Sequence, residues 1–245
     1  MPLSQRGRWC VLLLCVAGGT TLPGLGCGNP SSATPAAGAA TPSAPNARAT
    51  APAHASTSAT QQAAVQPRDR SAEDADVAAI EKLDGRVHRE GPDRVVVKVD
   101  LARDNITDAD LVHVRLFSAL QELDLHAPLI SDAGLEHLQG LTTLRVLNLN
   151  FTSISGPGLV HLRGLTRLQE LDLGSSHLQD GGLEYLRSLT QLQTLNLKLT
   201  GVTDAGLEHL RALPNLLRLD VRLTHVTDMG VKRLQQALPH LKIEF

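Results

Sequence analysis

The stretch that decides the fold runs from Leu192 to Leu213 and reads LQTLNLKLTGVTDAGLEHLRAL. Its pattern is L-x-x-L-x-L, a small polar residue, an aliphatic residue, a Thr-Asp-x-Gly turn and L-x-x-L-x-x-L. The pattern recurs every 24 residues, and the opening leucines are Leu120, Leu144, Leu168, Leu192 and Leu216. A fixed period of this length predicts a solenoid, in which each repeat buries its apolar side against its neighbours.

Each repeat carries the signals of one short strand and one short helix. Leu195 and Leu197 alternate with polar residues, which favours a strand with its apolar side chains directed inward. Thr203 before Asp204 is typical of a helix start, because the hydroxyl caps the first turn and the helix dipole favours the acid. Leucines spaced by three then mark the buried side of the helix. We therefore expect parallel strands along a concave face and helices along a convex face.

This pattern resembles the leucine-rich repeat family, and the Thr-Asp-x-Gly-Leu turn resembles its ribonuclease-inhibitor-like subgroup. The resemblance covers about 150 of the 245 residues. It implies an α/β fold, namely a right-handed solenoid with one strand and one helix in each repeat. It implies little about function, because one fold carries many functions.

The repeat domain is predicted to cover residues 96–245 with about six repeats. Counting back by one period from Leu120 gives a degenerate first repeat at Val96. An N-terminal cap is expected over residues 71–95, where an amphipathic helical pattern precedes a possible hairpin around Gly91. At the other end, a final half-strand is predicted to cover the last apolar face through Leu241, Ile243 and Phe245.

The first 70 residues differ from the repeats in composition. Two arginines precede an apolar run over residues 9–17 that is too short to span a bilayer, which is typical of a signal peptide, here predicted over residues 1–26. Cys27 follows in a sequence that resembles a bacterial lipobox, which implies its lipidation and a place in the cell envelope. An ordinary secretory leader and a retained leader are the alternatives. The Ala-, Pro-, Ser- and Thr-rich residues 27–70 are predicted to form a disordered linker.

Charge and motif content argue against several classes of function. The formal net charge of −2 does not favour a nucleic-acid partner, since such proteins carry a clustered basic excess. All three cysteines lie within residues 1–27, so the repeats hold no thiol for a disulfide or a zinc site. The phosphate-loop, dinucleotide and nucleophile-elbow motifs are absent. We therefore expect no enzyme, no cofactor, no metal site and no small-molecule substrate.

Candidate binding residues lie on the concave face. The fifth position of each repeat is Asp or Asn and lies between two buried strand residues. This column is either a recognition stripe or a polar filler bonded to its neighbours. Residues at the eighth position either anchor a partner or shield the strand ends. The predicted partner-binding residues are Asp124, His126, Asn148, Asn150, Phe151, Glu170, Asp172, Lys198, Leu199, Arg218, Asp220, Arg222 and Leu223.

The sequence thus predicts a non-enzymatic module, anchored in the envelope through Cys27, that binds a protein or peptide partner through its concave face. The alternative is a structural envelope component without a specific high-affinity partner. A separate prediction concerns a column of small hydroxyl residues, which we expect to hydrogen-bond the turn backbone. These are Thr152, Ser176, Thr200 and Thr224.

Overall fold

A computed structural model describes residues 70–245 of the chain. The predicted signal peptide, Cys27 and all but the last residue of the predicted linker lie outside the described residues. Among residues 70–245, no helix combines the length and apolar character needed to cross a membrane.

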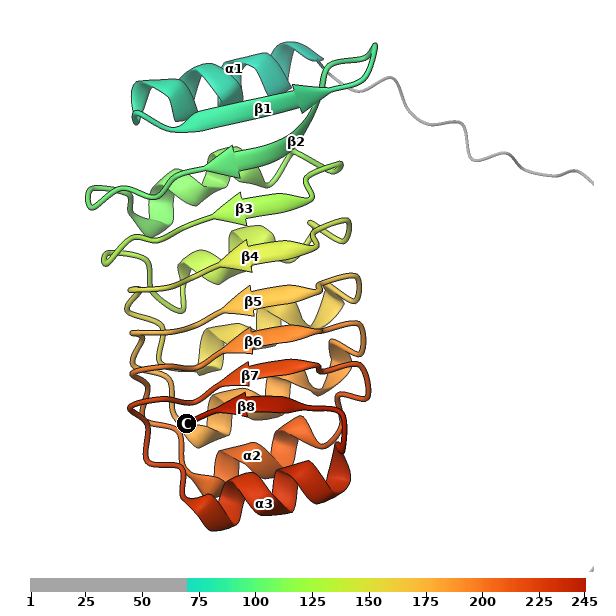
Figure 1. Cartoon of the computed structure of the whole chain (residues 1–245). Coiled ribbons are helices and arrows are strands. Elements are labelled where there is room, and N and C mark those ends of the chain that lie inside the picture. The colour runs from blue at the N-terminus through green and yellow to red at the C-terminus, as the bar shows by residue number, and fades with distance from the viewer. Residues whose placement is uncertain (1–69) are drawn as a thin grey trace, which may run out of the picture. The chain divides into compact units, whose positions relative to one another are not determined.

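Eight strands form one open sheet, in the order β1 to β8 (Figure 1). β1 (Arg86–Glu90) and β2 (Val95–Asp100) form an antiparallel hairpin, and β2 to β8 are parallel. The remaining strands are β3 (Glu122–Asp124), β4 (Val146–Asn148), β5 (Glu170–Asp172), β6 (Thr194–Asn196), β7 (Arg218–Asp220) and β8 (Lys242–Glu244). β2 contributes six residues to the sheet, and each later repeat strand contributes three.

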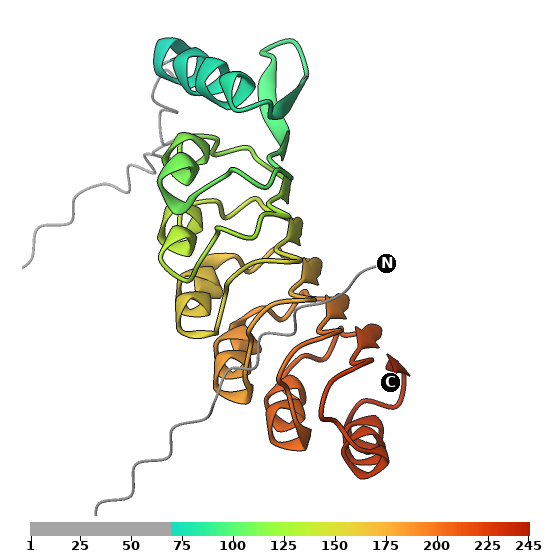
Figure 2. The ribbon, with the colours of Figure 1, turned by 90° about the vertical axis from the view of Figure 1, so that its left-hand side faces the viewer.

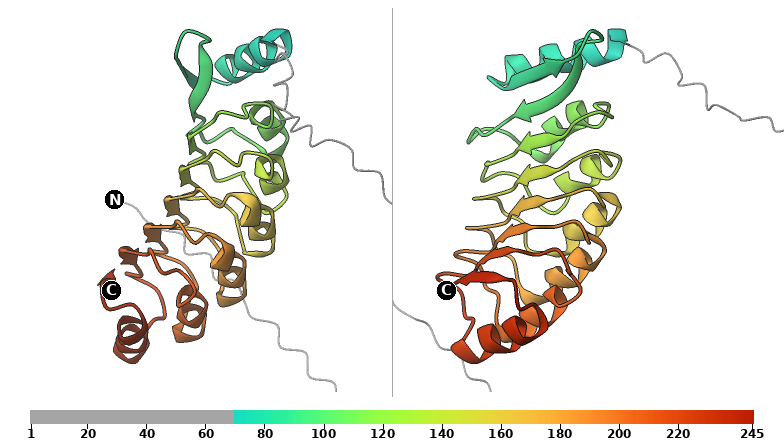
Figure 3. Two further views of the ribbon diagram at one scale, coloured as in Figure 1. Left: turned by 90° about the vertical axis from the view of Figure 1, so that its right-hand side faces the viewer. Right: turned by 45° about the vertical axis from the view of Figure 1, so that its right-hand side comes forward.

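Helices lie along the opposite side of the repeats from the strands (Figures 2 and 3). α1 (Arg70–Lys82) precedes the hairpin, and one helix follows each of β2 to β7. These are η1 (Asp108–Val114), η2 (Gly134–Leu138), η3 (Pro157–Gly164), η4 (Asp180–Ser188), α2 (Asp204–Leu210) and α3 (Asp228–Ala237). The strand–turn–helix order predicted for each repeat is confirmed.

The first four of these repeat helices are 3-10 helices, and only the last two are α-helices. Leucines three residues apart fit a helix with three residues per turn. α2 and α3 also have side-chain caps, since the hydroxyls of Thr203 and Thr227 accept from Ala205 N and Gly230 N. The sequence pattern alone did not distinguish the two helix types.

Parallel strands pair in the register that the 24-residue period predicts. Leu171 of β5 faces Leu195 of β6, which faces Leu219 of β7, and each of the three is only 1% exposed. The polar residues on either side of each leucine point away from this core. Aliphatic side chains from all repeats form one continuous core, and Val77 and Ile80 of α1 extend it past the hairpin.

The prediction that Phe245 helps to cover the last apolar face of the core is wrong. Leu241 is buried and Ile243 is half-buried, but Phe245 is 60% exposed and lies beyond the end of β8. A residue at this position in an inner repeat is covered by the following strand and turn. β8 is the outermost strand of the described sheet, so no neighbouring strand covers Phe245.

In four repeats, a carboxylate at the start of the helix or in the turn just before it bonds the next repeat, and we call this contact the carboxylate clamp. Asp132 is the most extensively bonded example. It accepts from Ser155 N (3.1 Å), Ser155 Oγ (2.5 Å), Gly156 N (3.2 Å) and Gly158 N (2.8 Å) of the next repeat. Asp108, Asp180 and Asp204 each accept a backbone and a hydroxyl bond from the residue 23 positions later.

The glycine of the Thr-Asp-x-Gly turn makes room for this clamp. A Cβ atom at Gly206 would overlap Oδ1 of Asp180, and one at Gly230 would overlap Oδ1 of Asp204. The third repeat has Gly156 where the others have the aspartate, so its turn offers no carboxylate to the fourth repeat. The turn signal therefore specifies the contact between repeats as well as the start of a helix.

Candidate functional site

The predicted column of Asp and Asn residues at the fifth position is bonded within the protein. Asp172 accepts from Gly174 N (2.8 Å), Asn150 Nδ2 (3.1 Å) and Asn196 Nδ2 (3.0 Å). Asp124 accepts from Asn148 Nδ2 at 3.0 Å and from the backbone N–H of His126 at 3.1 Å. All of these fifth-position side chains are half-buried. The geometry favours the polar-filler interpretation for Asp124, Asn148 and Asp172.

Arg222 is also engaged within the protein. Its guanidinium donates to Asp220 Oδ1 at 2.9 Å and to Asp220 Oδ2 at 2.5 Å, and it lies 3.2 Å from Glu244 Oε2. Partial burial raises the pKa of Asp220. The hydrogen bonds and charge of Arg222 and the charge of nearby Lys198 lower this pKa by more, so its net shift is downward. Half of the Arg222 side chain remains exposed. It orders the end of the strand face and is only partly free for a ligand.

The turn that follows each strand carries the most exposed apolar side chains of this face. We define the post-strand turns as residues 126–129, 150–153, 174–177, 198–201 and 222–225. Phe151 is 50% exposed, Leu199 49% and Leu223 70%. The ring of His126 stacks on that of Phe151 with centroids 5.6 Å apart. The alternative in which the eighth-position residues shield the strand ends does not fit these exposures.

These apolar residues have an unusual backbone conformation. Phe151, Leu199 and Leu223 have φ values of 58°, 58° and 57°, and Ser175 at the same position has 54°. Left-handed backbone costs a residue with a Cβ about 1 kcal/mol or more, and bulky residues rarely adopt it. Glycine or asparagine would occupy the same turn at lower cost.

Hydrogen bonds on both sides hold the left-handed residue in place. The N–H of Leu199 donates to Arg222 O at 3.0 Å, which ties the turn to the next repeat. The buried Thr200 hydroxyl donates to Leu197 O at 2.7 Å. Thr152, Ser176 and Thr224 donate to the equivalent carbonyls at 2.7, 2.6 and 2.6 Å. The prediction that these hydroxyls bond the turn backbone is confirmed.

Charge on the strand face changes along the sheet. At the third position of the repeat, Lys98 on β2 and Glu122 on β3 form an ion pair of 2.7 Å. The hydrogen bond and the charge of Glu122 raise the pKa of Lys98. Glu170 on β5 and Arg218 on β7 are exposed at the same position. At this repeat position the exposed side chains therefore change from acidic Glu170 on β5 to basic Arg218 on β7 and Lys242 on β8.

Sequence reasoning did not include several side chains that belong to this surface. Leu129 is 54% exposed in a post-strand turn, two positions after the buried Ala127. His177 and His225 are exposed in the equivalent turns of later repeats. Lys242 is exposed on β8, in the strand position paired with Arg218. The 24-residue register could have found all four, because each lies a whole number of periods from a residue in the same turn or strand position.

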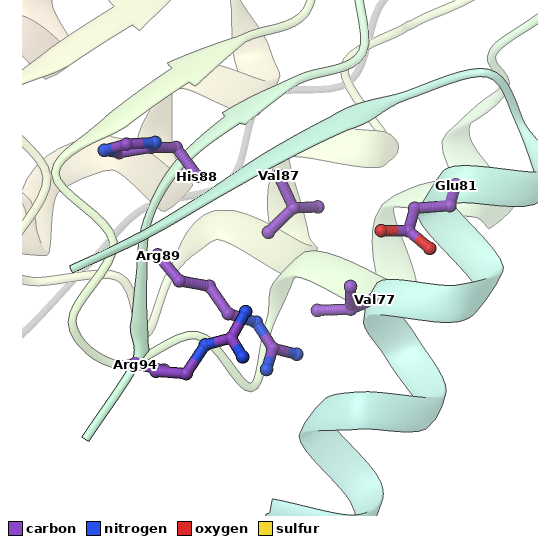
Figure 4. A pocket seen from close by; sticks show the side chains of 6 residues that line it. All are labelled: Val77, Glu81, Val87, His88, Arg89 and Arg94. Carbon is purple, nitrogen blue, oxygen red and sulfur yellow. The ribbon is translucent and has the colours of Figure 1, made fainter. Parts of the chain in front are cut away.

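A depression at the N-terminal end offers a second, weaker candidate (Figure 4). It is lined by Val77 and Glu81 of α1 and by Val87, His88, Arg89 and Arg94 of the hairpin segment. The Arg89 guanidinium already donates to Asp74 at 2.6 Å. No group of three or more His, Cys, Asp or Glu within residues 70–245 is placed to hold a metal ion. The depression contains no arrangement that points to a particular ligand.

Comparison with known proteins gives the following matches. The family model described as Leucine Rich repeat matches residues 140–162, 165–186 and 188–210. No curated protein matches the sequence. A leucine-rich repeat protein of Leptospira interrogans is 23% identical with a TM-score of 0.47; the alignment covers 55% of this chain but only 33% of that protein.

Two internalins of Listeria monocytogenes also align. Internalin C2 is 20% identical over 69% of this chain and 80% of its own, with a TM-score of 0.47. A second internalin is 18% identical over 70% of this chain and 54% of its own, with a TM-score of 0.46. The family match over three segments of residues 140–210, the 24-residue period and the strand that opens each repeat together support a leucine-rich repeat architecture for this part of the chain.

Proposed function

We propose that this protein is a non-enzymatic protein-binding module whose partner contacts the post-strand turns and the adjoining strand face. Leucine-rich repeat proteins generally mediate protein–protein interaction. The main observation in support of this proposal is that Phe151, Leu199 and Leu223 are exposed and have left-handed backbone. Bulky apolar residues at these positions cost folding energy and cover little of the core, so folding alone does not account for them.

The surface has the composition of a binding site. Protein interfaces concentrate their binding energy in a few apolar or aromatic anchors and in arginine. Phe151, Leu199 and Leu223 supply the anchors. Arg222 directly precedes Leu223 in its turn, and Arg218 lies on the adjoining strand β7. Asp124, Asn148, Asn150 and Asp172 contribute indirectly, since their hydrogen bonds fix the strand ends from which the turns project.

The proposal includes an envelope location. The lipobox-like sequence before Cys27 supports a lipid anchor, and the Ala- and Pro-rich residues that follow support a tether between anchor and repeats. Buried acyl carbons each contribute about 0.8 kcal/mol to membrane binding, so two or more chains would hold the protein durably. A partner would therefore be met at the membrane surface. Metabolic labelling with a palmitate analogue, comparing the natural chain with Cys27→Ala, tests this part of the proposal.

The binding function is tested by crosslinked capture from native cells with a triple variant, Phe151→Asn/Leu199→Asn/Leu223→Asn. Asparagine tolerates left-handed backbone, so this variant removes the anchors without straining the turns. The matched control is Leu217→Gln/Met229→Gln, which removes exposed apolar side chains outside the post-strand turns. We expect the natural chain and the control to retain a partner that the triple variant loses. If the natural chain, the triple variant and the control capture the same partners, or if none of them captures a partner, the structural role is favoured instead.

A further inference from the structure

Three cations on the C-terminal part of the strand face make no hydrogen bond or ion pair with their side chains among residues 70–245, although the charge of one of them, Lys198, acts on nearby Asp220. Arg218 of β7 and Lys242 of β8 are exposed, and no hydrogen bond or ion pair joins either side chain to another described residue. Lys198, in the turn after β6, also lacks such a partner for its ammonium group. We call these three residues the unpaired cations. Figure 1 shows β6, β7 and β8 next to one another at this end of the sheet.

Two of the unpaired cations lie directly opposite each other. Arg218 and Lys242 are register partners on neighbouring parallel strands, on the exposed side of the buried Leu219. Neighbouring strands are about 4.8 Å apart, and like charges in facing positions repel each other. The other strand neighbour of Arg218 in this column is Thr194, and the nearest carboxylate there is Glu170, two strands away. The fold therefore holds two positive charges together without a neutralising group.

The acidic residues of this region are already occupied. The Arg222 guanidinium donates to both carboxylate oxygens of Asp220 and lies 3.2 Å from Glu244 Oε2. The other end of the same column differs, because Lys98 and Glu122 neutralise each other at 2.7 Å. The post-strand turns themselves contain no Asp or Glu. We therefore expect an external group to neutralise the positive charge at the C-terminal end of the sheet.

Apolar anchors lie at the end of the strand face where Lys198 is found. Leu199 follows Lys198 directly, and Leu223 occupies the equivalent position in the next turn. The two turns are bonded to each other through Leu199 N and Arg222 O at 3.0 Å. A ligand that extends along the strand face from Arg218 and Lys242 to Lys198 therefore also meets two leucines that are 49% and 70% exposed. A purely polar polyanion would make no apolar contact with those leucines. A protein segment can pair its carboxylates with the cations and pack its apolar side chains on the leucines.

We infer that the partner presents an acidic protein segment, with apolar side chains beside its carboxylates, to β6–β8 and their turns. Its carboxylates pair with Arg218, Lys242 and Lys198, and its apolar side chains pack on Leu199 and Leu223. This inference rests on the proposed function and adds the chemistry of the partner. Attraction between complementary charges steers association and weakens as salt screens it.

The test selects binders from a random 12-residue peptide library displayed on phage, using the purified full chain in low salt. A synthetic peptide of the enriched type is then titrated against the natural chain, Arg218→Glu/Lys242→Glu and Leu199→Asn/Leu223→Asn. Reversing both charges keeps two like charges in facing positions, so stability is expected to change little. The control, Arg145→Glu/Arg167→Glu, makes the same charge change at exposed arginines before β4 and β5. Circular dichroism melting confirms that each variant is folded.

We expect enriched peptides to combine Asp or Glu with apolar residues, and their binding to weaken as salt is raised. Each test variant should bind about tenfold more weakly or worse, and the control should stay within about twofold. Neutral or basic peptides that only the leucine variant loses would overturn the acidic partner and leave the binding face intact. Peptides bound equally by all variants, or no enrichment, would overturn both. Retention on heparin that charge reversal abolishes and the leucine variant keeps would identify a polyanion instead.

Discussion

Two kinds of turn lie between strand and helix in the repeats of this protein, and their residues serve opposite purposes. The carboxylate clamp, exemplified by Asp132, makes up to four hydrogen bonds to the next repeat and stabilises the stack. The post-strand turn places Phe151, Leu199 and Leu223 in left-handed backbone with about half or more of each side chain in solvent. The first turn is explained by folding. The second is not, which is why we assign the binding surface to it.

The largest expected effect concerns the core on which both turns depend. Leu195→Asp would place a carboxylate at a site that is 1% exposed, without a partner. Burial of such a charge costs several kcal/mol, comparable with the whole free energy of unfolding of a domain of this size. We expect loss of the folded state by circular dichroism. A folded Leu195→Asp variant with an unchanged melting temperature would contradict the strand register.

The next effect compares two aspartates at the same repeat position. Asp132→Ala removes four hydrogen bonds between repeats, and we expect it to lower the free energy of unfolding by about 2–3 kcal/mol. Asp228 opens α3 in the last repeat and makes no hydrogen bond or ion pair with its side chain among the described residues. Asp228→Ala should therefore cost only the helix-dipole contribution, about 0.5 kcal/mol. Urea denaturation of both variants measures the difference, and equal losses would contradict the clamp.

Acid should weaken the carboxylate clamp, with a smaller effect on stability than Asp132→Ala. Burial raises the pKa of Asp132, but hydrogen bonds from Ser155, Gly158 and Gly156 lower it by more. Bonds from the backbone and hydroxyl of Thr227 lower the pKa of Asp204. Their pKa values in the folded state thus lie below the unfolded value of about 3.9. Their stabilisation is complete above that pH and is lost as the pH falls through the folded-state pKa values.

Thermal melting between pH 6 and pH 2 measures this dependence. We expect the melting temperature to fall mainly below about pH 4. The fall should be less steep in Asp132→Asn, which lacks one of the titrating groups. A melting temperature that falls equally steeply in this variant would show that the acid sensitivity arises at other groups.

The smallest expected effect has the opposite sign. Leu199→Asn relieves left-handed strain and exposes no core, so we expect the free energy of unfolding to rise by about 0.5–1 kcal/mol. The matched Leu197→Asn variant, two residues earlier at a fully buried position, should be strongly destabilised. Stability that drops in Leu199→Asn would show that this side chain serves folding, and the contrast between the two turns would disappear.

Much of the fold could be predicted from the sequence because the repeats of this one chain can be aligned with one another. The 24-residue period predicted that Leu171, Leu195 and Leu219 would face one another, and they do. The helix before the hairpin could be seen in the spacing of Val77 and Ile80. Phe245 could not be placed correctly, because its burial depends on a following strand and turn rather than on its own pattern. The helix type also depended on the caps and packing of each turn.

The site was only partly visible in the sequence. Register identified which side chains share the strand face, including Arg218 and Arg222. It could not tell that Arg222 is occupied by Asp220 while Arg218 is unpaired, because that depends on side-chain geometry between strands. It also could not show left-handed backbone at Phe151 and Leu199, since nothing in those residue types favours it.

The sequence by itself determined the period, the core positions and the hydroxyls that bond each turn, because each depends on residues at fixed spacing along the chain. Only the tertiary structure decided which polar groups are satisfied and which are left over. Hydrogen bonds and ion pairs join residues 22 to 26 positions apart across repeats, and a few ångströms separate a bonded carboxylate from a free one. The binding surface proposed here consists of what those contacts leave exposed.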